Sequence, residues 1–361
     1  MKYLNLIEDL TNAKGAPGFE DEVIKVITKY KNNYQMQVDH LKNVYLNLDQ
    51  IDSSKPTLML DSHTDEVAFM VKAIDSRGLI LIQPLGGWLP THISAQHYLV
   101  RDSEGNYHHG ICTSKPIHFM TAEERQKPLT IQDLKIDIGA CSREEVIQEF
   151  KIEVGQPIIP ATQFIYNSKN QTMLAKAFDN RIGVAVSLAV MNELAEMIQE
   201  LPYNVVAAFA AQEEVGLRGA KVTSQLVKPN LAIVFEGTPS DDFTGDEFTE
   251  QARMKMGPQL RYLDNSYIAN EWLLKRFKQL ASKHEIPLQH AVREGGSTNA
   301  GSIHLSNLGV PTATLGTPTR YAHTNLSFCS YQDFQDTVRL AKIFLESLSK
   351  EDFNDFKIKT I

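Results

Sequence analysis

The sequence predicts an α/β fold that carries a smaller, β-rich domain as an insertion. Residues 1–66 and 167–361 alternate short apolar segments of strand length with longer amphipathic segments of helical period. Between them, residues 67–166 show short alternating segments separated by glycine, proline and polar turns, which is typical of a β domain. A chain of 361 residues is long enough for both. We therefore expect a main domain built from 1–66 and 167–361, with an inserted domain at 67–166.

The N-terminal segment predicts two helices followed by two strands. Apolar residues at helical spacing predict the helices within residues 2–31, with a break at Gly15-Ala-Pro-Gly18. Acidic residues open the second helix, as the helix dipole favours. Val44–Leu48 and Thr57–Leu60 are predicted strands, and the second of them is expected to be buried.

His63 and Asp65 follow the second strand. A strand that ends in His-x-Asp places an imidazole at the edge of the sheet, with a carboxylate two residues away that is able to bind a metal ion or to orient the ring. The alternative is a turn histidine whose hydrogen bonds are satisfied locally. The choice between these two interpretations therefore depends on whether other strands supply further metal ligands.

Residues 67–166 predict the inserted β domain. Val67–Val71 and Leu79–Ile82 alternate as strands do, and helical patterning is confined to a short segment near Ser142–Phe150. Five histidines fall in this range, but their spacings match no recurring pattern of metal ligands. We therefore predict that these are surface or loop residues: His92, His97, His108, His109 and His118.

Asp179 stands just before a clear amphipathic helix, whose apolar face contains Val184, Leu188, Met191 and Leu194. Two interpretations are open. The side chain can cap the helix, which needs no further function. It can also bridge two cations, because each carboxylate oxygen can bind one metal ion.

Val205–Gly219 is the most informative stretch. An apolar run, long enough for one strand buried on both faces, stops at Glu213 and Glu214 and is followed by glycine-punctuated chain. Two neighbouring acids point in different directions, so one can hold a metal ion while the other handles a proton. The alternative is a solvated strand end.

Two further strands also lead to candidate ligands. Asn230–Phe235 is a predicted buried strand that ends at Glu236, and Val310–Leu315 leads through Gly, Thr, Pro and Arg to His323. In open α/β sheets, binding sites lie beyond the carboxyl ends of the strands. The recurrence of candidate ligands at these ends is therefore the strongest physical argument for one shared site. The last third also predicts helices at Tyr267–His284 and Asp333–Leu348, a glycine-rich segment at Glu294–Gly301 and a frayed polar tail at 351–361.

Composition and charge exclude several classes of protein. The net charge of -8, without a basic stripe, argues against a nucleic-acid surface. No run approaches the roughly 18 apolar residues of a membrane span, and the acidic start lacks the pattern of a signal peptide. The 3 cysteines are scattered, which indicates neither a disulfide framework nor a thiolate metal site. We expect a cytoplasmic protein with no nucleic-acid or membrane partner.

Two imidazoles with several carboxylates and no cysteine suit zinc, cobalt or manganese. Two such ions bridged by Asp179, each completed by one histidine and one further acid, can activate a shared water and polarise a carbonyl. The remaining carboxylate can serve as general base and pass the proton to the leaving nitrogen. This chemistry cleaves an amide.

Four motifs, in this order, resemble the glutamyl aminopeptidase and tetrahedral (TET) aminopeptidase family of dinuclear metallopeptidases. They are His63-Thr-Asp65, Ala177-Phe-Asp179-Asn-Arg, Gln212-Glu-Glu-Val-Gly-Leu-Arg-Gly-Ala220 and Thr319-Arg-Tyr-Ala-His323. The similarity spans nearly the whole chain. It implies His63 and Glu236 on one metal ion, Glu214 and His323 on the other, Asp179 as the bridge, Glu213 as the general base, and Asp65 as the carboxylate that supports His63.

The resemblance also implies a fold and an assembly. The fold would be a phosphorylase/hydrolase-like α/β/α sandwich with an inserted small β-barrel, a PDZ-like dimerisation domain. The assembly would be a homo-oligomer, in which dimers form a hollow tetrahedral dodecamer that admits short peptides.

The sequence departs from this family in two places. Many relatives carry Asp where Glu236 stands, and many have Gly-Thr-Asp-Ala where this chain has Ser297-Thr-Asn-Ala. Substrate preference is therefore open. A basic residue in the side-chain pocket would favour acidic N-terminal residues, with Arg261, Lys255 and Arg293 as candidates, whereas an apolar pocket would favour Leu or Met.

We predict a metal-dependent aminopeptidase that releases N-terminal residues from short peptides. The alternative is a related metal-dependent deacylase or amidohydrolase that acts on a non-peptide amide. A non-catalytic binding protein is disfavoured because Glu213 and all five ligand positions are intact. Sugar cleavage by two carboxylates would not explain the histidines at the strand ends.

Overall fold

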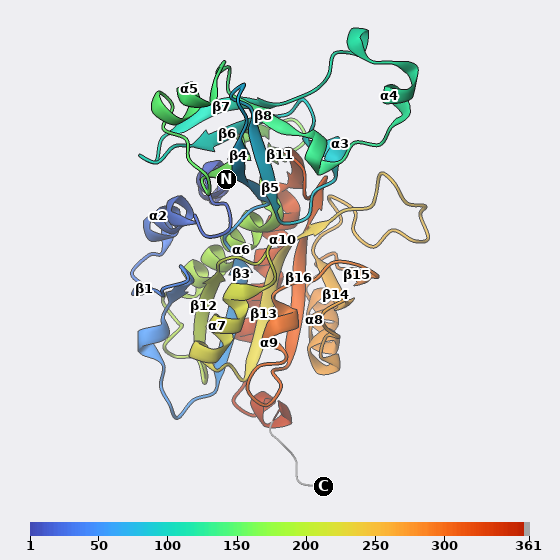
Figure 1. Ribbon diagram of the computed structural model, residues 1–361. Helices are drawn as coiled ribbons and strands as arrows, with labels where there is room; N and C mark the ends of the chain where they lie inside the picture. Colours follow the sequence, from blue (N-terminus) through green and yellow to red (C-terminus); the bar gives the residue numbers. More distant parts are fainter. Residues whose placement is uncertain (357–361) are drawn as a thin grey trace.

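A sheet of eleven strands forms the centre of the main domain (Figure 1). The computed structural model describes residues 1–356. Four parallel strands lie side by side in the middle of the sheet, in the order β12, β3, β13, β16. Their carboxyl ends therefore meet at one edge of the sheet. Their bounds are Asn204–Ala210, Thr57–His63, Leu231–Pro239 and Thr312–Arg320.

Shorter strands extend the sheet on both sides of this parallel centre. β1 and β2 continue it beyond β12, whereas β17, β11 and β10 continue it beyond β16, and β14 and β15 branch from β16. The strands that join β12 and β16 from these sides run antiparallel to them. The bounds are Met36–Val38, Val44–Leu46, Ser327–Ser330, Thr172–Ala175, Ile165–Asn167, Gln259–Leu263 and Gln289–Val292.

Helices cover both faces of the sheet, as an α/β/α sandwich requires. α7 and α9 lie in front of the parallel strands in Figure 1, and α6 and α10 lie behind them. α6 packs against all four parallel strands and is buried nearly all round, which explains its small and apolar residues. The helices are α1 (Leu4–Asn12), α2 (Asp21–Tyr30), α6 (Phe178–Leu194), α7 (Arg218–Val227), α8 (Glu271–Lys283), α9 (Ala300–Ile303) and α10 (Tyr331–Glu346).

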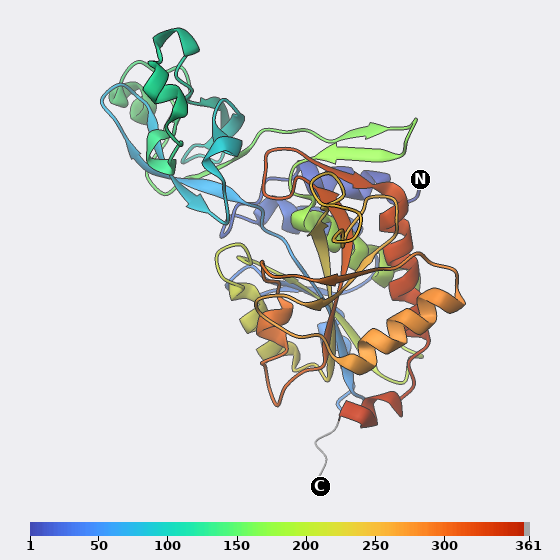
Figure 2. The ribbon, with the colours of Figure 1, turned by 90° about the vertical axis from the view of Figure 1, so that its right-hand side faces the viewer.

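Six strands form a closed barrel with its own hydrophobic core, set apart from the sheet in Figure 2. The barrel order is β4, β5, β8, β7, β6, β9. The strands span Ala68–Ile74, Ile80–Leu85, Lys135–Asp137, Tyr107–Cys112, His97–Arg101 and Pro157–Pro160. The short helices α3 (Pro90–Ile93), α4 (Ala122–Gln126) and α5 (Arg143–Gln148) connect them. All six strands fall inside the range predicted for the insertion, whereas β10, which the predicted boundary crosses, already belongs to the main sheet.

The central strands are longer than their apolar runs predict. β3 continues to His63, and β13 continues past Glu236 to Pro239, so Glu236 lies within its strand and not at the end. The apolar pattern stops at Glu236, but backbone pairing with β16 continues to Pro239. Pairing with β16, and not the apolar pattern, therefore determines where β13 ends.

Three other predictions need correction. α8 begins at Glu271 and not at Tyr267, because the Asn270 side chain accepts hydrogen bonds from the first backbone N–H groups of the helix. The short strands β1, β10, β11, β14, β15 and β17 of the main sheet were not predicted. The tail is not wholly polar and frayed: Phe353 is buried and contacts Tyr203, with ring centroids 5.2 Å apart. The rest of the predicted tail, 357–361, lies outside the described residues. None of the described helices combines the length and apolar character needed to cross a membrane.

Candidate metal centre

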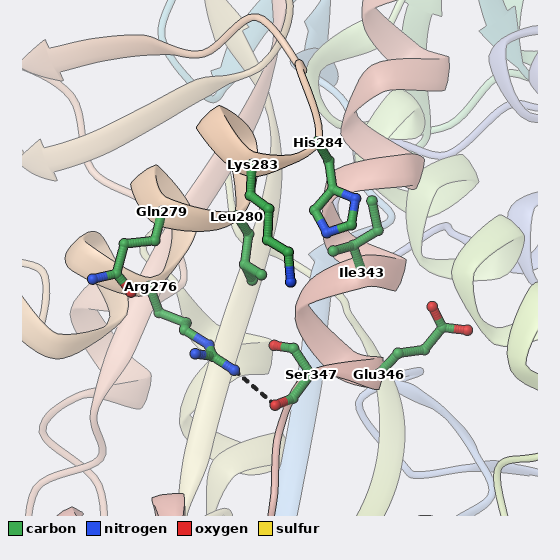
Figure 3. A pocket seen from close by; sticks show the side chains of 8 residues that line it. All are labelled: Arg276, Gln279, Leu280, Lys283, His284, Ile343, Glu346 and Ser347. Carbon is green, nitrogen blue, oxygen red and sulfur yellow. Dashed lines mark hydrogen bonds between the residues drawn. The ribbon is translucent and has the colours of Figure 1, made fainter.

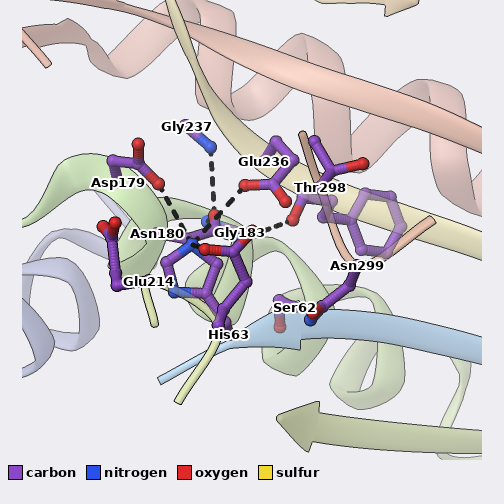
Figure 4. A network of polar contacts seen from close by, with 12 residues as sticks. Ser62, His63, Asp179, Asn180, Gly183, Glu214, Glu236, Gly237, Thr298 and Asn299 are labelled. Atoms are coloured by element: carbon purple, nitrogen blue, oxygen red, sulfur yellow. Dashed lines mark hydrogen bonds and ion pairs between the residues drawn. The ribbon is translucent and has the colours of Figure 1, made fainter. Parts of the chain in front are cut away.

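The carboxyl edge of the parallel strands gathers the predicted ligands. Val234 on β13 pairs with Asp61 on β3, so Glu236 and His63, two residues further along each strand, come to the same level. Glu213 and Glu214 follow β12 directly, and His323 follows β16. In Figure 4, carboxylates from these elements surround the ring of His63.

Asp179 reaches this edge because the start of α6 docks closely on β13. The Asn180 side chain donates to the carbonyl of Phe235 (2.8 Å) and accepts from the backbone N–H of Gly237 (3.0 Å). A Cβ on Gly237 would lie 2.4 Å from the carbonyl oxygen of Phe178, so only glycine allows this approach. Asp179 lies inside α6, after the N-cap residue Ala177, and its side chain contacts His63 and His323, which rules out the capping interpretation.

The two oxygens of Asp179 face two different imidazoles. Its Oδ1 lies 3.1 Å from His63 Nε2, and its Oδ2 lies 3.3 Å from His323 Nε2. A second acid stands beside each ring: Glu236 Oε2 is 3.8 Å from His63 Nε2, and Glu214 Oε2 is 3.6 Å from His323 Nε2. Donor atoms around a tetrahedral ion at about 2.1 Å lie about 3.4 Å apart. Two three-residue groups, which share Asp179, therefore have the spacing of metal ligands.

Each imidazole is oriented through its other nitrogen. His63 Nδ1 lies 3.1 Å from the backbone carbonyl of Asp65, and His323 Nδ1 lies 2.9 Å from that of Gly87. A carbonyl oxygen can only accept, so Nδ1 carries the proton in both rings. Both Nε2 atoms are then free to bind a metal ion.

Asp65 holds the pair of glutamates in place. Its carboxylate accepts hydrogen bonds from the backbone N–H groups of Glu213 (2.9 Å) and Glu214 (3.1 Å). The carboxylate is further from His63 Nδ1, at 3.5 Å, than the Asp65 carbonyl is. The carboxylate of Asp65 thus organises the segment after β12 more directly than it supports the ring.

Glu213 lies next to the two groups without belonging to either. Its Oε2 is 3.8 Å from His63 Nε2. A third possible group combines His63, Glu213 and Glu214, but it leaves out Asp179. The roles of Glu213 as general base and Glu214 as metal ligand therefore stay a prediction.

The buried, closely spaced carboxylates of the cluster favour the binding of cations. Burial, together with neighbouring acids, raises the pKa of Glu213 and Glu236 well above the usual range and that of Glu214 to about 8. Burial alone would lower the pKa of His323, but Glu214 and Asp179 raise it to about 10. Within residues 1–356, Glu214 Oε1 and Glu236 Oε1 are buried without a hydrogen-bond partner. Two divalent ions beside these carboxylates would offset their negative charge, so the residues present fit such a pair.

A cavity of about 640 Å³ opens onto this cluster. Its wall contains Gly87 from the barrel, the glycine-rich segment 294–298, and both Arg261 and Arg293, whereas Lys255 is not among the residues that form it. Sequence patterns give no signal for Gly87, which contributes only a backbone carbonyl. Asn180 lies inside a recognised motif, yet the motif alone did not indicate that it joins α6 to β13.

Other candidate groups lie away from the cluster. A second cavity, of about 380 Å³, lies between α8 and α10 (Figure 3). Among its lining residues, His284 is the one histidine and Glu346 the one acid, which is too few for a group of three metal ligands. Three of the five histidines of residues 67–166, His97, His108 and His109, lie on barrel strands and not in loops. Four of the five are exposed, and His108 is half-buried beside Asp102.

Comparison with known proteins agrees with this chemistry. The chain matches the family described as M42 glutamyl aminopeptidase over residues 43–340. It is 30% identical over 361 residues to the glutamyl aminopeptidase of Lactococcus lactis subsp. cremoris, with 99% of each chain covered. It is 30% identical over 358 residues to the putative aminopeptidase FrvX of Escherichia coli, with 98% of each chain covered.

A solved structure gives the same result. The TET aminopeptidase from a marine sediment archaeon, Thaumarchaeota, superposes with a TM-score of 0.92 at 33% identity and covers 99% of this chain and 100% of that one. The predicted mixed α/β fold with a barrel is thereby confirmed. The chain belongs to the M42 glutamyl aminopeptidase family, and it is an aminopeptidase, a hydrolase that acts on peptide bonds.

Proposed function

We propose that the protein releases N-terminal residues from short peptides at a dinuclear metal centre. The observation that carries this proposal is the position of Asp179, whose two oxygens each face one imidazole with one further acid beside it. His63 and Glu236 would hold one ion, and Glu214 and His323 the other.

Two divalent ions supply a Lewis acid for the scissile carbonyl and lower the pKa of a bound water. Glu213 acts as the general base: it takes a proton from the attacking water and passes it to the leaving nitrogen. Its buried carboxylate lies beside His63 without belonging to either group that shares Asp179. Asp65 holds Glu213 and Glu214 in place by accepting hydrogen bonds from their backbone N–H groups.

Zinc, cobalt and manganese are the ions we propose. Imidazole and carboxylate donors without a thiolate suit all three. The cysteines, Cys112, Cys141 and Cys329, are free thiols, and none belongs to a potential ligand group in the described part of the chain. The experiment is to strip the protein of metal, add each ion separately and measure the release of free amino acids from short peptides. Activity that survives complete removal of metal would contradict the proposal.

The cavity favours an acidic N-terminal side chain. Apart from glycines and Pro239, every described residue that lines it is polar or charged. Arg261 and Arg293 each form an ion pair, with Asp264 and Asp241, yet the Nε of each arginine is buried without a partner among residues 1–356. A carboxylate of the substrate can accept from these donors, whereas an apolar side chain would leave them unsatisfied.

Aminoacyl amides of Glu and Leu test this preference. We expect faster turnover of the Glu amide, and Arg261→Gln should remove most of the difference while turnover of the Leu amide changes little. Preferred turnover of the Leu amide by the unmodified protein would contradict the preference. Activity on acylated amides that lack a free N-terminus would instead support the amidohydrolase alternative, which the aminopeptidase relatives do not favour.

Assembly into dimers and a tetrahedral dodecamer is also a proposal, based on the family resemblance. Ile117 and Phe119, on the segment between β7 and β8, support it because they are 58% and 73% exposed, and exposed large apolar side chains often mark an interface. Light scattering should give twelve times the 40.6 kDa mass of one chain. A mass of one or two chains would contradict the dodecamer.

The free cysteines support a cytoplasmic location.

A further inference from the structure

The two imidazoles of the centre are held by different parts of the molecule. His63 is oriented by the backbone of Asp65, which belongs to the main domain. His323 is oriented by the carbonyl of Gly87, which lies between the barrel strand β5 and the short helix α3. The barrel therefore fixes the ring position of one ligand and not of the other.

The segment 321–326, which we name the His323 loop, joins β16 to β17. Thr324 organises it internally: its hydroxyl lies within hydrogen-bonding distance of the carbonyls of Tyr321 (2.9 Å) and Leu326 (2.6 Å), to either of which it can donate, and it accepts from the backbone N–H of Leu326. These bonds shape the loop but do not attach it to the rest of the protein. Its external attachments decide where His323 points.

Asn325 provides three of those attachments, and all of them lead to the barrel or to its connection with the main domain. Its Oδ1 accepts from the hydroxyl of Tyr98 (2.9 Å), its Nδ2 donates to the carbonyl of His97 (3.2 Å), and its own carbonyl accepts from the hydroxyl of Thr162 (2.6 Å). Asn325 is only 4% exposed. With the Gly87 contact of His323, these are the hydrogen bonds that tie the loop to described residues outside it, apart from the carboxylates that face the His323 ring.

The aromatic core of the barrel connects the two attachment points. Trp88, next to Gly87, stacks on Phe69 with ring centroids 4.8 Å apart and donates to the carbonyl of Ala68. Tyr98, which holds Asn325, packs edge-on against the same Phe69 at 5.5 Å. Trp88, the neighbour of Gly87, and Tyr98 therefore pack on the same residue of the barrel core.

The same barrel segment also touches the second acid of this half of the centre. A Cβ on Gly86 would lie 3.0 Å from Glu214 Oε2, so the backbone at Gly86 packs directly against that carboxylate. Both Glu214 and His323 thus contact the barrel segment 86–87. His63 and Glu236, in contrast, are carried by β3 and β13 of the central sheet.

We propose that Asn325 is a positioning residue that anchors the His323 loop to the inserted barrel, so that the barrel sets the metal affinity of the half of the centre formed by Glu214 and His323. The other half, formed by His63 and Glu236, does not depend on this anchor. The inference rests on the proposed two-metal function.

The test is a titration of the metal-stripped, full-length protein with Zn²⁺ by calorimetry. Tyr98→Phe removes only the hydroxyl that holds Asn325, and Asn325→Ala removes both side-chain attachments and keeps the backbone carbonyl that accepts from Thr162. We expect both variants to bind one ion as tightly as the unmodified protein and the other about 10-fold more weakly, since partners that orient a ligand contribute about 10- to 100-fold to affinity. Because Asn325→Ala removes a buried side chain and can impair folding, Tyr98→Phe provides the second measurement.

Two backgrounds assign the weakened ion to one half of the centre. In His63→Ala, which retains Glu214 and His323, adding Tyr98→Phe should weaken the remaining ion about 10-fold. In His323→Ala, which retains His63 and Glu236, the same addition should change nothing.

Tyr203→Phe is the matched control. It also removes a buried hydroxyl, one that bonds the carbonyl of Leu345 away from the centre, so it reports any general loss of stability. Its metal affinities should equal those of the unmodified protein.

The outcomes separate the inference from the function on which it rests. Unchanged affinities in both Tyr98→Phe and Asn325→Ala, or equal weakening of both ions, would overturn the inference and leave the two-metal function standing. Weakening by Tyr203→Phe to the same extent as by Tyr98→Phe would also overturn it. An unmodified protein that binds a single ion would overturn the two-metal function itself.

Discussion

Glu213 and Glu214 are neighbours in the chain, yet their carboxylates face different imidazoles. Glu214 Oε2 approaches His323 and Glu213 Oε2 approaches His63. Asp65 makes this divergence possible, because one carboxylate accepts the backbone N–H groups of both glutamates and fixes the turn that follows β12. A metal ligand and a general base can therefore come from one dipeptide.

Glu213→Gln should lower turnover by about 10²- to 10⁴-fold, the usual contribution of a general base, with little change in KM. The protein should still bind two metal ions, because the amide keeps the shape of the side chain and the proposed ligands are untouched. Amino-acid release and metal analysis on the same sample measure both effects.

Glu294→Gln is the control for this variant. Glu294 lines the same cavity but belongs to no potential ligand group among the described residues. It should retain turnover within a few fold. If Glu213→Gln instead lost one metal ion, Glu213 would be a ligand and the roles of the two glutamates would have to be exchanged.

The stability of the metal-free protein should fall as pH rises. Burial raises the pKa of Glu214 from 4.5 to about 8, so its contribution is fully present below pH 4.5 and is lost as pH rises through about 8. His323 acts in the same direction between pH 6.5 and about 10, because Glu214 and Asp179 raise its pKa against the effect of burial. Metal ions displace these protons, so metal affinity should rise over the same window.

Thermal unfolding measures this effect. The unfolding temperature of stripped protein should decrease from pH 6 to pH 9, and a fixed concentration of free Zn²⁺ should raise it more at pH 9 than at pH 6. The decrease should be smaller in His323→Ala. A stripped protein whose unfolding temperature increases over this window would contradict the electrostatic account.

The contact between α6 and β13 places Asp179, the proposed bridging ligand, at the site. Asn180 binds the backbone of β13 on both sides of Glu236, and glycine at 237 and at 183 lets the two backbones approach. Asp179 is thereby brought beside Glu236 from a separate element.

Gly237→Ala should disturb this contact. Its Cβ would lie 2.4 Å from the carbonyl oxygen of Phe178 and 2.9 Å from the backbone nitrogen of Asp179, so α6 must shift. We expect a loss of about 1–3 kcal/mol in the free energy of unfolding, together with weaker binding of both metal ions.

Gly245→Ala is the matched control, since the nearest atom to its Cβ is the carbonyl oxygen of Asp241, 3.4 Å away. It should change the free energy of unfolding by less than about 0.5 kcal/mol. Urea unfolding of stripped protein and Zn²⁺ titration measure the two effects. Unchanged metal affinity in Gly237→Ala would show that Asp179 does not depend on this contact.

The central strands and most ligands could be predicted because buried parallel strands are apolar on both faces. Thr57–Leu60 and the run before Glu213 are of this kind, so the polar residues that follow them stand out. The end of β13 could not be predicted, because its pairing with β16 outlasts the apolar run. β14 was missed for a related reason: it is short, contains Arg261, and depends on its neighbours for burial.

The anchors of the site could not be predicted from local patterns. Gly87 acts through a backbone carbonyl, which no side-chain pattern records. Asn325 meets Tyr98 across 227 positions of sequence, and a single asparagine in a polar segment carries no signal of its own. Only the folded arrangement of the barrel and sheet brings them together.

At the scale of the whole molecule, the centre lies where the inserted barrel meets the open edge of the sheet. The main domain provides every proposed ligand, from the strands of the sheet, the segments that follow them and α6. The barrel contributes Gly87, which lines the cavity and accepts a hydrogen bond from His323. The insertion is therefore part of the site and not only an appended domain. His63 and Glu236 are carried by β3 and β13 of the sheet, and Asp179 is carried by α6.

Anomalous diffraction from crystals of zinc-loaded protein tests the two-metal centre most directly. We predict two peaks on either side of Asp179, one in contact with His63 and Glu236 and the other with Glu214 and His323, with Glu213 bound to neither ion. A single peak, or a peak bound by Glu213 in place of Asp179, would contradict the account.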